Sequence, residues 1–328
     1  MDPNNKTPLL AFAAVLIIYG LLGWLDVGNF AQGGWATDPD NTVTQVLAGS
    51  PTEAAGLQAG DKIISMGGIA MTDAEALTRR ARPEVGETWE FVVERDGVTV
   101  SLDVTFGEPV PERKFLAHAG FLVGFCFIGF TMRAYMQKQT ASTRALALVG
   151  TLFSLAFLGG PYFENYMMRS VVNAISVLLV WFGVASILNF LLVHLKSGGN
   201  RLLYLPALVV GLFIAWRILA TPEATSGLNN FGNILFGVVA GFYLIGSLVT
   251  VYQSFSGATA SERESQGLQL MMIGALIGLV PPIVAIVVGV VAPQAVLPGQ
   301  NFYFLTMIAI PITWSMAVLK GPGTEASA

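Results

Sequence analysis

Residues 43–66 read VTQVLAGSPTEAAGLQAGDKIISM, and this segment decides how the N-terminal part of the chain is interpreted. Gly49-Ser50-Pro51 is typical of a turn that leads into a short helix, here predicted over residues 52–55 and ended by Gly56. Short runs of apolar and β-branched residues alternate with such turns. These runs predict four strands, over residues 42–46, 62–66, 88–95 and 98–106. The segment therefore belongs to a small folded domain and not to a membrane span.

Two further features complete this domain. Thr72 and Glu75 have the spacing of a capping box, which predicts a helix that starts there and ends near Arg82. Asp96-Gly97 separates the last two strands, and this pair accepts the positive φ angles of a tight hairpin turn. We therefore expect an α+β domain within residues 26–114.

The rest of the chain is far more apolar. Of the 328 residues, 54% are apolar and 12% are charged, and the mean hydropathy of +0.64 is too high for a soluble protein. Runs of about 20 apolar residues cross a bilayer as helices. Eight such runs are predicted, over residues 9–25, 115–132, 145–162, 171–195, 202–220, 228–255, 267–292 and 302–319. The net charge of -4 is spread without a basic block, so we expect the lipid bilayer and no nucleic acid as a partner.

The distribution of lysine and arginine between the loops predicts the orientation in the membrane. One side would carry Lys6, Arg133, Lys138, Arg144, Lys196, Arg201, Arg263 and Lys320, and the other Arg113, Lys114, Arg169 and Arg217. The side richer in positive charge is expected to be the cytoplasm. Both termini would then be cytoplasmic, and residues 26–114 would be extracytoplasmic.

The motifs within residues 43–106 resemble those of bacterial, circularly permuted PDZ domains. The resemblance rests on Gly49-Ser50-Pro51, Ala54-Ala55-Gly56-Leu57, Gly60-Asp61 and Ile63-Ile64, in this order. It implies a groove between a strand and the helix after Thr72, where an extended peptide or a protein C-terminus adds as a strand. It also implies a glycine-rich loop that binds the terminal carboxylate. The residues that would line this site are Gly33, Gly34 and Trp35 in the loop, with Leu77 and Arg80 on the helix.

Three arginines lie close together near the end of this helix. Arg79, Arg80 and Arg82 would either favour acidic peptide tails or form an ordinary solvated face.

The membrane part resembles the sensor region of PDZ-containing bacterial histidine kinases of the competence-pheromone receptor type. The similar segments are residues 189–194, 203–206, 263–281 and 310–317. The resemblance implies a multi-pass protein of the bacterial plasma (inner) membrane. Its parts would be a transmembrane anchor (residues 1–25), an extracytoplasmic PDZ-like domain (26–114), a seven-helix bundle (115–320) and a short cytoplasmic tail (321–328).

The expected fold class is therefore an α-helical integral membrane protein with eight transmembrane helices and an inserted small α+β PDZ-like domain. The kinase or phosphatase module of the histidine-kinase family is not found after Lys320. A separate cytoplasmic kinase or phosphatase is accordingly expected as a partner.

The motifs of membrane proteases are absent from the sequence. PDZ domains also occur beside membrane helices in site-2 metalloproteases, whose zinc site needs a motif such as H-E-x-x-H. The chain has two histidines, His118 and His194, which would lie near opposite membrane faces. Neither a Gly-x-Ser-Gly of the rhomboid type nor an intramembrane aspartyl motif is present. We therefore expect no enzyme activity, no metal and no cofactor.

Ionisable residues and helix breaks at membrane depth are candidates for function. Arg217 would either reach the outer lipid headgroups or pair with Glu164 or Glu223 to bind an anionic ligand. His118 would be interfacial or would sense protons. The pair Pro281 and Pro282 predicts a kink that serves packing or acts as a hinge beside a cavity.

Two functions agree with these observations. The first is a receptor-like signal-input protein, which binds a peptide or protein terminus through its PDZ-like domain and relays a change to the cytoplasmic partner. The alternative is a membrane scaffold that recruits envelope proteins without signalling. Small-molecule transport is disfavoured, because no inverted repeat with broken helices is found.

Overall fold

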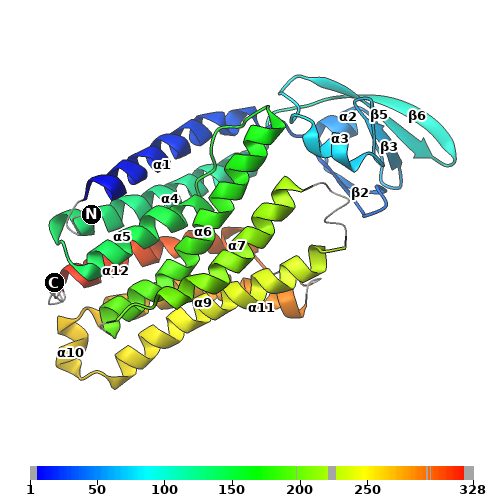
Figure 1. Ribbon diagram of the computed structural model, residues 1–328. Helices are drawn as coiled ribbons and strands as arrows, with labels where there is room; N and C mark the ends of the chain where they lie inside the picture. The colour runs from blue at the N-terminus through cyan, green and yellow to red at the C-terminus, as the bar shows by residue number, and fades with distance from the viewer. Residues whose placement is uncertain (1–5, 197, 221–226, 293–294, 296, 321–328) are drawn as a thin grey trace.

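The computed structural model describes residues 6–196, 198–220, 227–292, 295 and 297–320. It consists of a helix bundle with a small β domain at one end (Figure 1). The main helices are α1 (Thr7–Asp26), α4 (Pro111–Gln137), α5 (Ala141–Phe153), α6 (Tyr166–Leu195), α7 (Tyr204–Leu219), α9 (Asn229–Gly257), α11 (Leu268–Val291) and α12 (Ala309–Lys320). Shorter helical segments are η1 (Val27–Asn29), η2 (Ser154–Ala156), η3 (Arg201–Leu203), α10 (Ala260–Ser265) and η4 (Gln300–Ile308).

Seven helical segments in the described part of the chain are long and apolar enough to cross a membrane. This confirms the predicted α-helical membrane fold, although one of the eight predicted spans differs. Ala141–Ala156, which overlaps the span predicted over residues 145–162, is a shorter apolar helix of roughly 24 Å, less than the ~30 Å hydrocarbon core. After this helix, the backbone at Gly159 packs directly against α1. The contact is so close that a Cβ on Gly23 of α1 would lie 2.2 Å from the Gly159 carbonyl oxygen.

The largest cluster of buried side chains lies where α4, α5 and α6 meet α11 and α12. Phe127, Phe190 and Trp314 are completely buried there. The Trp314 indole N–H donates a 3.0 Å hydrogen bond to the carbonyl oxygen of Met271, so its polar atom is satisfied inside the bundle. Gly183 allows α6 to approach α5 closely, because a Cβ at this position would lie 2.6 Å from the backbone nitrogen of Phe153.

The β domain follows α1 and precedes α4. Its elements are β1 (Trp35–Thr37), β2 (Val43–Val46), α2 (Pro51–Ala54), β3 (Lys62–Met66), β4 (Ile69–Ala70), α3 (Ala74–Arg79), β5 (Thr88–Arg95) and β6 (Val98–Thr105). The strands β4-β3-β5-β6 form one antiparallel sheet, and β1 and β2 form a separate pair. The short strand β1 was not among the predicted strands.

Local chemistry explains where these elements start and stop. The β5–β6 hairpin turns at Asp96 (φ 52°) and Gly97 (φ 77°), which confirms the predicted turn. The predicted capping box at Thr72 is wrong, because the Asp73 side chain caps α3 by accepting a 2.9 Å hydrogen bond from the Ala76 N–H. The helix also ends at Arg79 instead of Arg82, since Arg82 precedes Pro83 and is therefore biased away from helical angles.

An ion pair with a buried carboxylate links the residue before β3 to the end of β5. The Asp61 side chain is 2% exposed and accepts two 2.7 Å hydrogen bonds from the Arg95 guanidinium and one of 2.8 Å from the Gln58 N–H. Arg95 also donates to the Gly56 carbonyl oxygen. The hydrogen bond from Arg95 holds the pKa of Asp61 below its ordinary value of 3.8.

Four side chains hold the β domain against the bundle. The Arg82 guanidinium binds both carboxylate oxygens of Asp26 at 2.8 and 2.7 Å, at the end of α1. The Arg82 N–H and the Arg169 guanidinium each donate a 2.7 Å hydrogen bond to the Tyr162 hydroxyl. Arg169, in the first turn of α6, also donates to the carbonyl oxygens of Thr78 (3.3 Å) and Arg80 (3.2 Å). We call Asp26, Arg82, Tyr162 and Arg169 the junction cluster.

The first and last helices of the described chain are placed alike with respect to the β domain. In Figure 1, α1 begins and α12 ends at the bundle end remote from the β domain. That the β domain and these two helix ends lie on opposite sides of a membrane stays a prediction. Which of the two sides is the cytoplasm remains a prediction from the positive charges.

We expect Asp61→Asn to lower the free energy of unfolding of the β domain by about 2–4 kcal/mol, because Arg95 would lose its counter-charge in a partly buried position. Hydrogen–deuterium exchange of β5 peptides in the full-length protein measures this. The control Glu75→Gln, which removes the exposed Glu75–Arg79 pair, should change it by about 0.5 kcal/mol or less. Equal effects of the two variants would contradict the prediction.

The same pair predicts a pH dependence. Because the folded-state pKa of Asp61 is depressed, its contribution is present above the unfolded-state value near 3.8 and is lost as the pH falls through the lower folded-state value. The stability difference between the wild type and Asp61→Asn should therefore shrink only below about pH 4. Exchange rates of β5 measured between pH 3 and 7 and corrected for intrinsic exchange would show this, and a constant difference would refute it.

Arg82→Leu should loosen the attachment of the β domain, because it leaves the carboxylate of Asp26 without its cation. Spin labels at Thr99 and Met167, in a background where Cys126 is replaced by Ser, would report the distance between the β domain and α6. The distance distribution should broaden in Arg82→Leu and stay narrow in the control Glu94→Gln. An unchanged distribution would show that the junction cluster is not needed for the attachment.

Candidate peptide-binding site

A hollow of about 320 Å³ lies beside the predicted glycine-rich loop of the β domain. We call it the loop pocket. Its lining consists of Ala31, Gln32, Gly33, Gly34, Trp35, Leu47, Met66, Pro83, Trp89, Phe106 and Arg113. The structure thus brings the three predicted loop residues together around one cavity, whose remaining wall is mainly apolar and aromatic.

The carbonyl oxygens of the glycine loop accept hydrogen bonds from other residues of the domain, whereas the N–H groups of the loop donate none within the described residues. The Gly33 carbonyl oxygen accepts from the N–H (3.1 Å) and the hydroxyl (3.0 Å) of Thr52, and the Gly34 carbonyl oxygen accepts from the Leu47 N–H at 2.8 Å. Among the described residues, the N–H groups of Gly33 and Gly34 donate no hydrogen bond. Backbone N–H groups in such a position bind carboxylates, so this loop is suited to a peptide C-terminus.

Both loop positions require glycine. Gly34 has a φ angle of 92°, and a Cβ there would lie 2.3 Å from the Cβ of Ser50. A Cβ on Gly33 would lie 1.9 Å from the ring of Trp35. This ring packs edge-on against Phe91, with 5.1 Å between the centroids, so Trp35 belongs to the core of the domain as well as to the pocket wall.

The strand after the loop offers a free edge. In the described part of the chain, β1 pairs with β2 and with no other strand. An extended peptide can therefore add to the other edge of β1 with its C-terminus pointing toward the loop pocket. This edge supplies the strand side of the predicted groove.

The helix residues predicted for the groove lie elsewhere or have other partners. Leu77 is half-buried on α3 and lines neither the loop pocket nor the hollow at the junction cluster. The Arg80 guanidinium donates to the carbonyl oxygens of Met66 (2.6 Å) and Gly67 (3.0 Å) and lies 3.3 Å from the centre of the Trp89 ring. Arg80 therefore fastens the end of α3 to the sheet.

The arginine cluster does not form a free positive face. Arg79 pairs with Glu75 at 2.5 Å, Arg80 binds the carbonyl groups, and Arg82 pairs with Asp26. Affinity for acidic peptide tails is thus not supported by these three side chains. A second hollow, of about 770 Å³ and polar, lies beside the junction cluster and includes Glu164 in its wall.

The candidates predicted within the membrane have different surroundings in the described part of the chain. Glu164 lies at the polar hollow, whereas the Arg217 guanidinium lies beside Gly232 of α9. Glu223 lies outside the described residues. The His118 ring rests against Trp24, with 4.5 Å between the ring centroids, and its Nδ1 is 2.8 Å from the Lys114 carbonyl oxygen.

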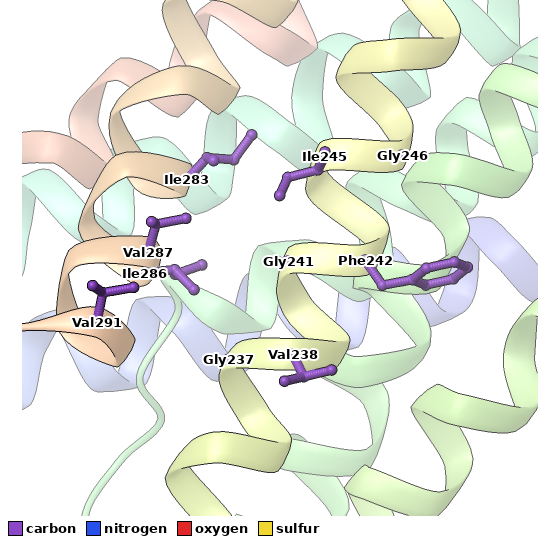
Figure 2. A pocket seen from close by; sticks show the side chains of 10 residues that line it. All are labelled: Gly237, Val238, Gly241, Phe242, Ile245, Gly246, Ile283, Ile286, Val287 and Val291. Carbon is purple, nitrogen blue, oxygen red and sulfur yellow. The ribbon is translucent and has the colours of Figure 1, made fainter.

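Pro281 and Pro282 lie inside α11, which continues through them. The next residue, Ile283, lines an apolar hollow of about 490 Å³ between α9 and α11. Figure 2 shows Ile283, Val287 and Val291 of α11 on one side and the helix with Gly237 and Gly241 on the other. The lining contains no polar side chain, so the hollow suits hydrocarbon and not a charged ligand.

Comparisons with known proteins identify the β domain and relate the chain to membrane proteases. The family model described as PDZ domain matches residues 35–106. "Probable protease eep" of Enterococcus faecalis is 26% identical over 197 residues, which cover 56% of this chain and 43% of that protein. "Putative zinc metalloprotease LL2128" of Lactococcus lactis is 26% identical over 197 residues, covering 57% of this chain and 44% of that protein. The chain spans less than half the length of these curated relatives. No solved structure matches it.

These comparisons correct the functional predictions. The relatives are named as proteases, so the predicted signal-input function, its scaffold alternative and the expected lack of enzyme activity are contradicted. The resemblance to histidine-kinase sensors and the kinase or phosphatase partner are not supported, whereas the PDZ domain and the membrane location are. The similarity to the first relative covers 56% of this chain and so extends well beyond residues 35–106. The prediction that the chain has no enzyme activity was based only on the absence of protease catalytic motifs.

The zinc ion implied by the name of the second relative does not fit the residues of this chain. Three or more His, Cys, Asp or Glu side chains that could hold a metal ion do not cluster anywhere in the described residues. His118 lies on α4 near the β domain, whereas His194 lies at the far end of α6, roughly 35–40 Å along that helix from Arg169. The two histidines therefore cannot share one metal.

Proposed function

We propose that this protein takes part in proteolysis at the membrane, where its PDZ domain binds an extended C-terminal segment of a polypeptide substrate. The observation that carries the proposal is the loop pocket. It combines two unpaired backbone N–H groups, an apolar wall and the free edge of β1 on a domain that is fastened to a membrane bundle. The names of the relatives supply the process in which such binding is used.

The attachment of the domain supports this proposal. Arg82 and Arg169 hold α3 and the residues after it against the ends of α1 and α6, so a bound segment would stay beside the membrane surface. A polypeptide that also spans the membrane would then meet the bundle and the PDZ domain together. From the distribution of positive charges we expect this surface to face away from the cytoplasm.

We assign substrate binding and placement to the described residues of the PDZ domain and its junction with the bundle. Because no metal fits the two histidines, we assign no step of peptide-bond hydrolysis to a metal held by this chain. Binding contributes to proteolysis by holding the scissile segment in reach of the reacting groups, which reduces the entropy lost in the reaction.

Leu47→Glu should weaken peptide binding about tenfold or more. Leu47 is 40% exposed and lines the loop pocket, so the added carboxylate would repel the terminal carboxylate of the peptide without a large loss of stability. Fluorescence anisotropy of labelled decapeptides with the full-length protein in nanodiscs measures the affinity. Val98→Glu is a matched control, because Val98 is 62% exposed and lies at the β5–β6 turn, outside the pocket.

Proteolysis itself is tested in native membrane vesicles with a single-pass reporter that carries the best-binding tail. The reporter should be cut faster in vesicles with the wild-type protein than in vesicles that lack it. Leu47→Glu should reduce the rate toward that of the vesicles without protein, and Val98→Glu should not. An equal cleavage rate with and without the protein would refute the proposed function.

A further inference from the structure

One charged residue of the loop pocket comes from outside the PDZ domain. Arg113 lies in the first turn of α4, beyond residues 35–106, and lines the same cavity as Gly33 and Gly34. Its side chain is exposed, and no ion pair or hydrogen bond joins it to another described residue. The next residue, Lys114, differs because it pairs with Glu108 at 2.6 Å.

The backbone keeps Arg113 close to the loop. Gln32 and Gly107 exchange backbone hydrogen bonds of 2.9 and 3.1 Å. The Val110 N–H donates a 3.1 Å hydrogen bond to the Gln32 side-chain oxygen, directly before α4 starts at Pro111. Three hydrogen bonds therefore join Gln32, the residue before the glycine loop, to residues 107–110, which lead directly into α4.

The other residues that line the loop pocket indicate what kind of ligand could bind beside Arg113. No acidic residue lines the pocket among the residues that the structure describes. Trp35, Leu47 and Met66, with Trp89 and Phe106, make an apolar chamber, which suits a large apolar side chain. The polar groups that remain are donors or cations, which suits an anion.

We infer that Arg113 completes the carboxylate-binding subsite of the loop pocket, so that the guanidinium and the N–H groups of Gly33 and Gly34 bind the terminal carboxylate together. This inference rests on the proposed function and names the substrate class, a free C-terminus with a large apolar last residue. Its consequence is that recognition is shared between the PDZ domain and a membrane helix. The C-terminus is thereby bound directly at the start of α4.

The test compares peptides that end in a free acid with the same peptides ending in an amide. The probes are fluorescein-labelled decapeptides ending in Leu or Phe, and the full-length protein is held in phosphatidylcholine nanodiscs to avoid competing anionic headgroups. The wild type should bind the acid at least tenfold more tightly than the amide. Arg113→Gln should lose most of this preference and bind the amide as the wild type does, whereas Arg113→Lys should keep part of it.

Arg79→Gln is the matched control, because Arg79 is an exposed arginine that lines neither hollow. It should keep the full preference for the acid. If Arg113→Gln keeps that preference too, the inference is overturned while peptide binding stands. If the wild type binds acid and amide equally, the carboxylate subsite is refuted. If it binds neither, both the proposed function and this inference fail.

Discussion

The pairing of Gln32 with Gly107 is the contact on which the arrangement of the molecule depends. Gln32 lies where the chain has just left α1, and Gly107 lies where it is about to enter α4. Their two backbone hydrogen bonds close the PDZ domain at its base, next to the membrane. Each such bond contributes only about 1 kcal/mol, but together they bring the glycine loop and the start of α4 to the same place.

The junction cluster adds orientation to this closure. Asp26 ends α1, Arg169 lies in the first turn of α6, and Arg82 follows α3, so the cluster joins two membrane helices to the PDZ domain. The partners are partly buried, which makes charged hydrogen bonds stronger than on an open surface. Under the proposed function, a peptide bound to this domain would be held beside the helix bundle. The two histidines of the chain do not fit a zinc ion, so the proposal assigns to this chain the placement of a substrate and no step of peptide-bond hydrolysis.

Sequence reasoning predicted much of the PDZ domain because its signals are local. The Asp96-Gly97 turn, the strand over residues 62–66 and the loop Gly33-Gly34-Trp35 depend on neighbours in the chain. Leu77 and Arg80 were assigned to the groove from the resemblance to PDZ domains, and for Arg80 the structure shows partners that this resemblance did not indicate. Arg80 found two carbonyl oxygens and the Trp89 ring across the domain, and no local pattern indicates such partners. Arg113 was not predicted as a site residue, because its place in the pocket follows from the Gln32–Gly107 pairing.

The sequence by itself determined that most of the chain lies in lipid and that a PDZ domain interrupts it after the first helix. The physical reason is that hydrophobic length and turn chemistry act over short distances along the chain. Only the tertiary structure decided that α5 is shorter than a membrane span, that three arginines are engaged in contacts and that a membrane helix contributes to the loop pocket. These features depend on contacts between residues far apart in sequence. For the arginines in particular, the free energy of burying or exposing the charge is set by the groups that lie beside it in the folded protein.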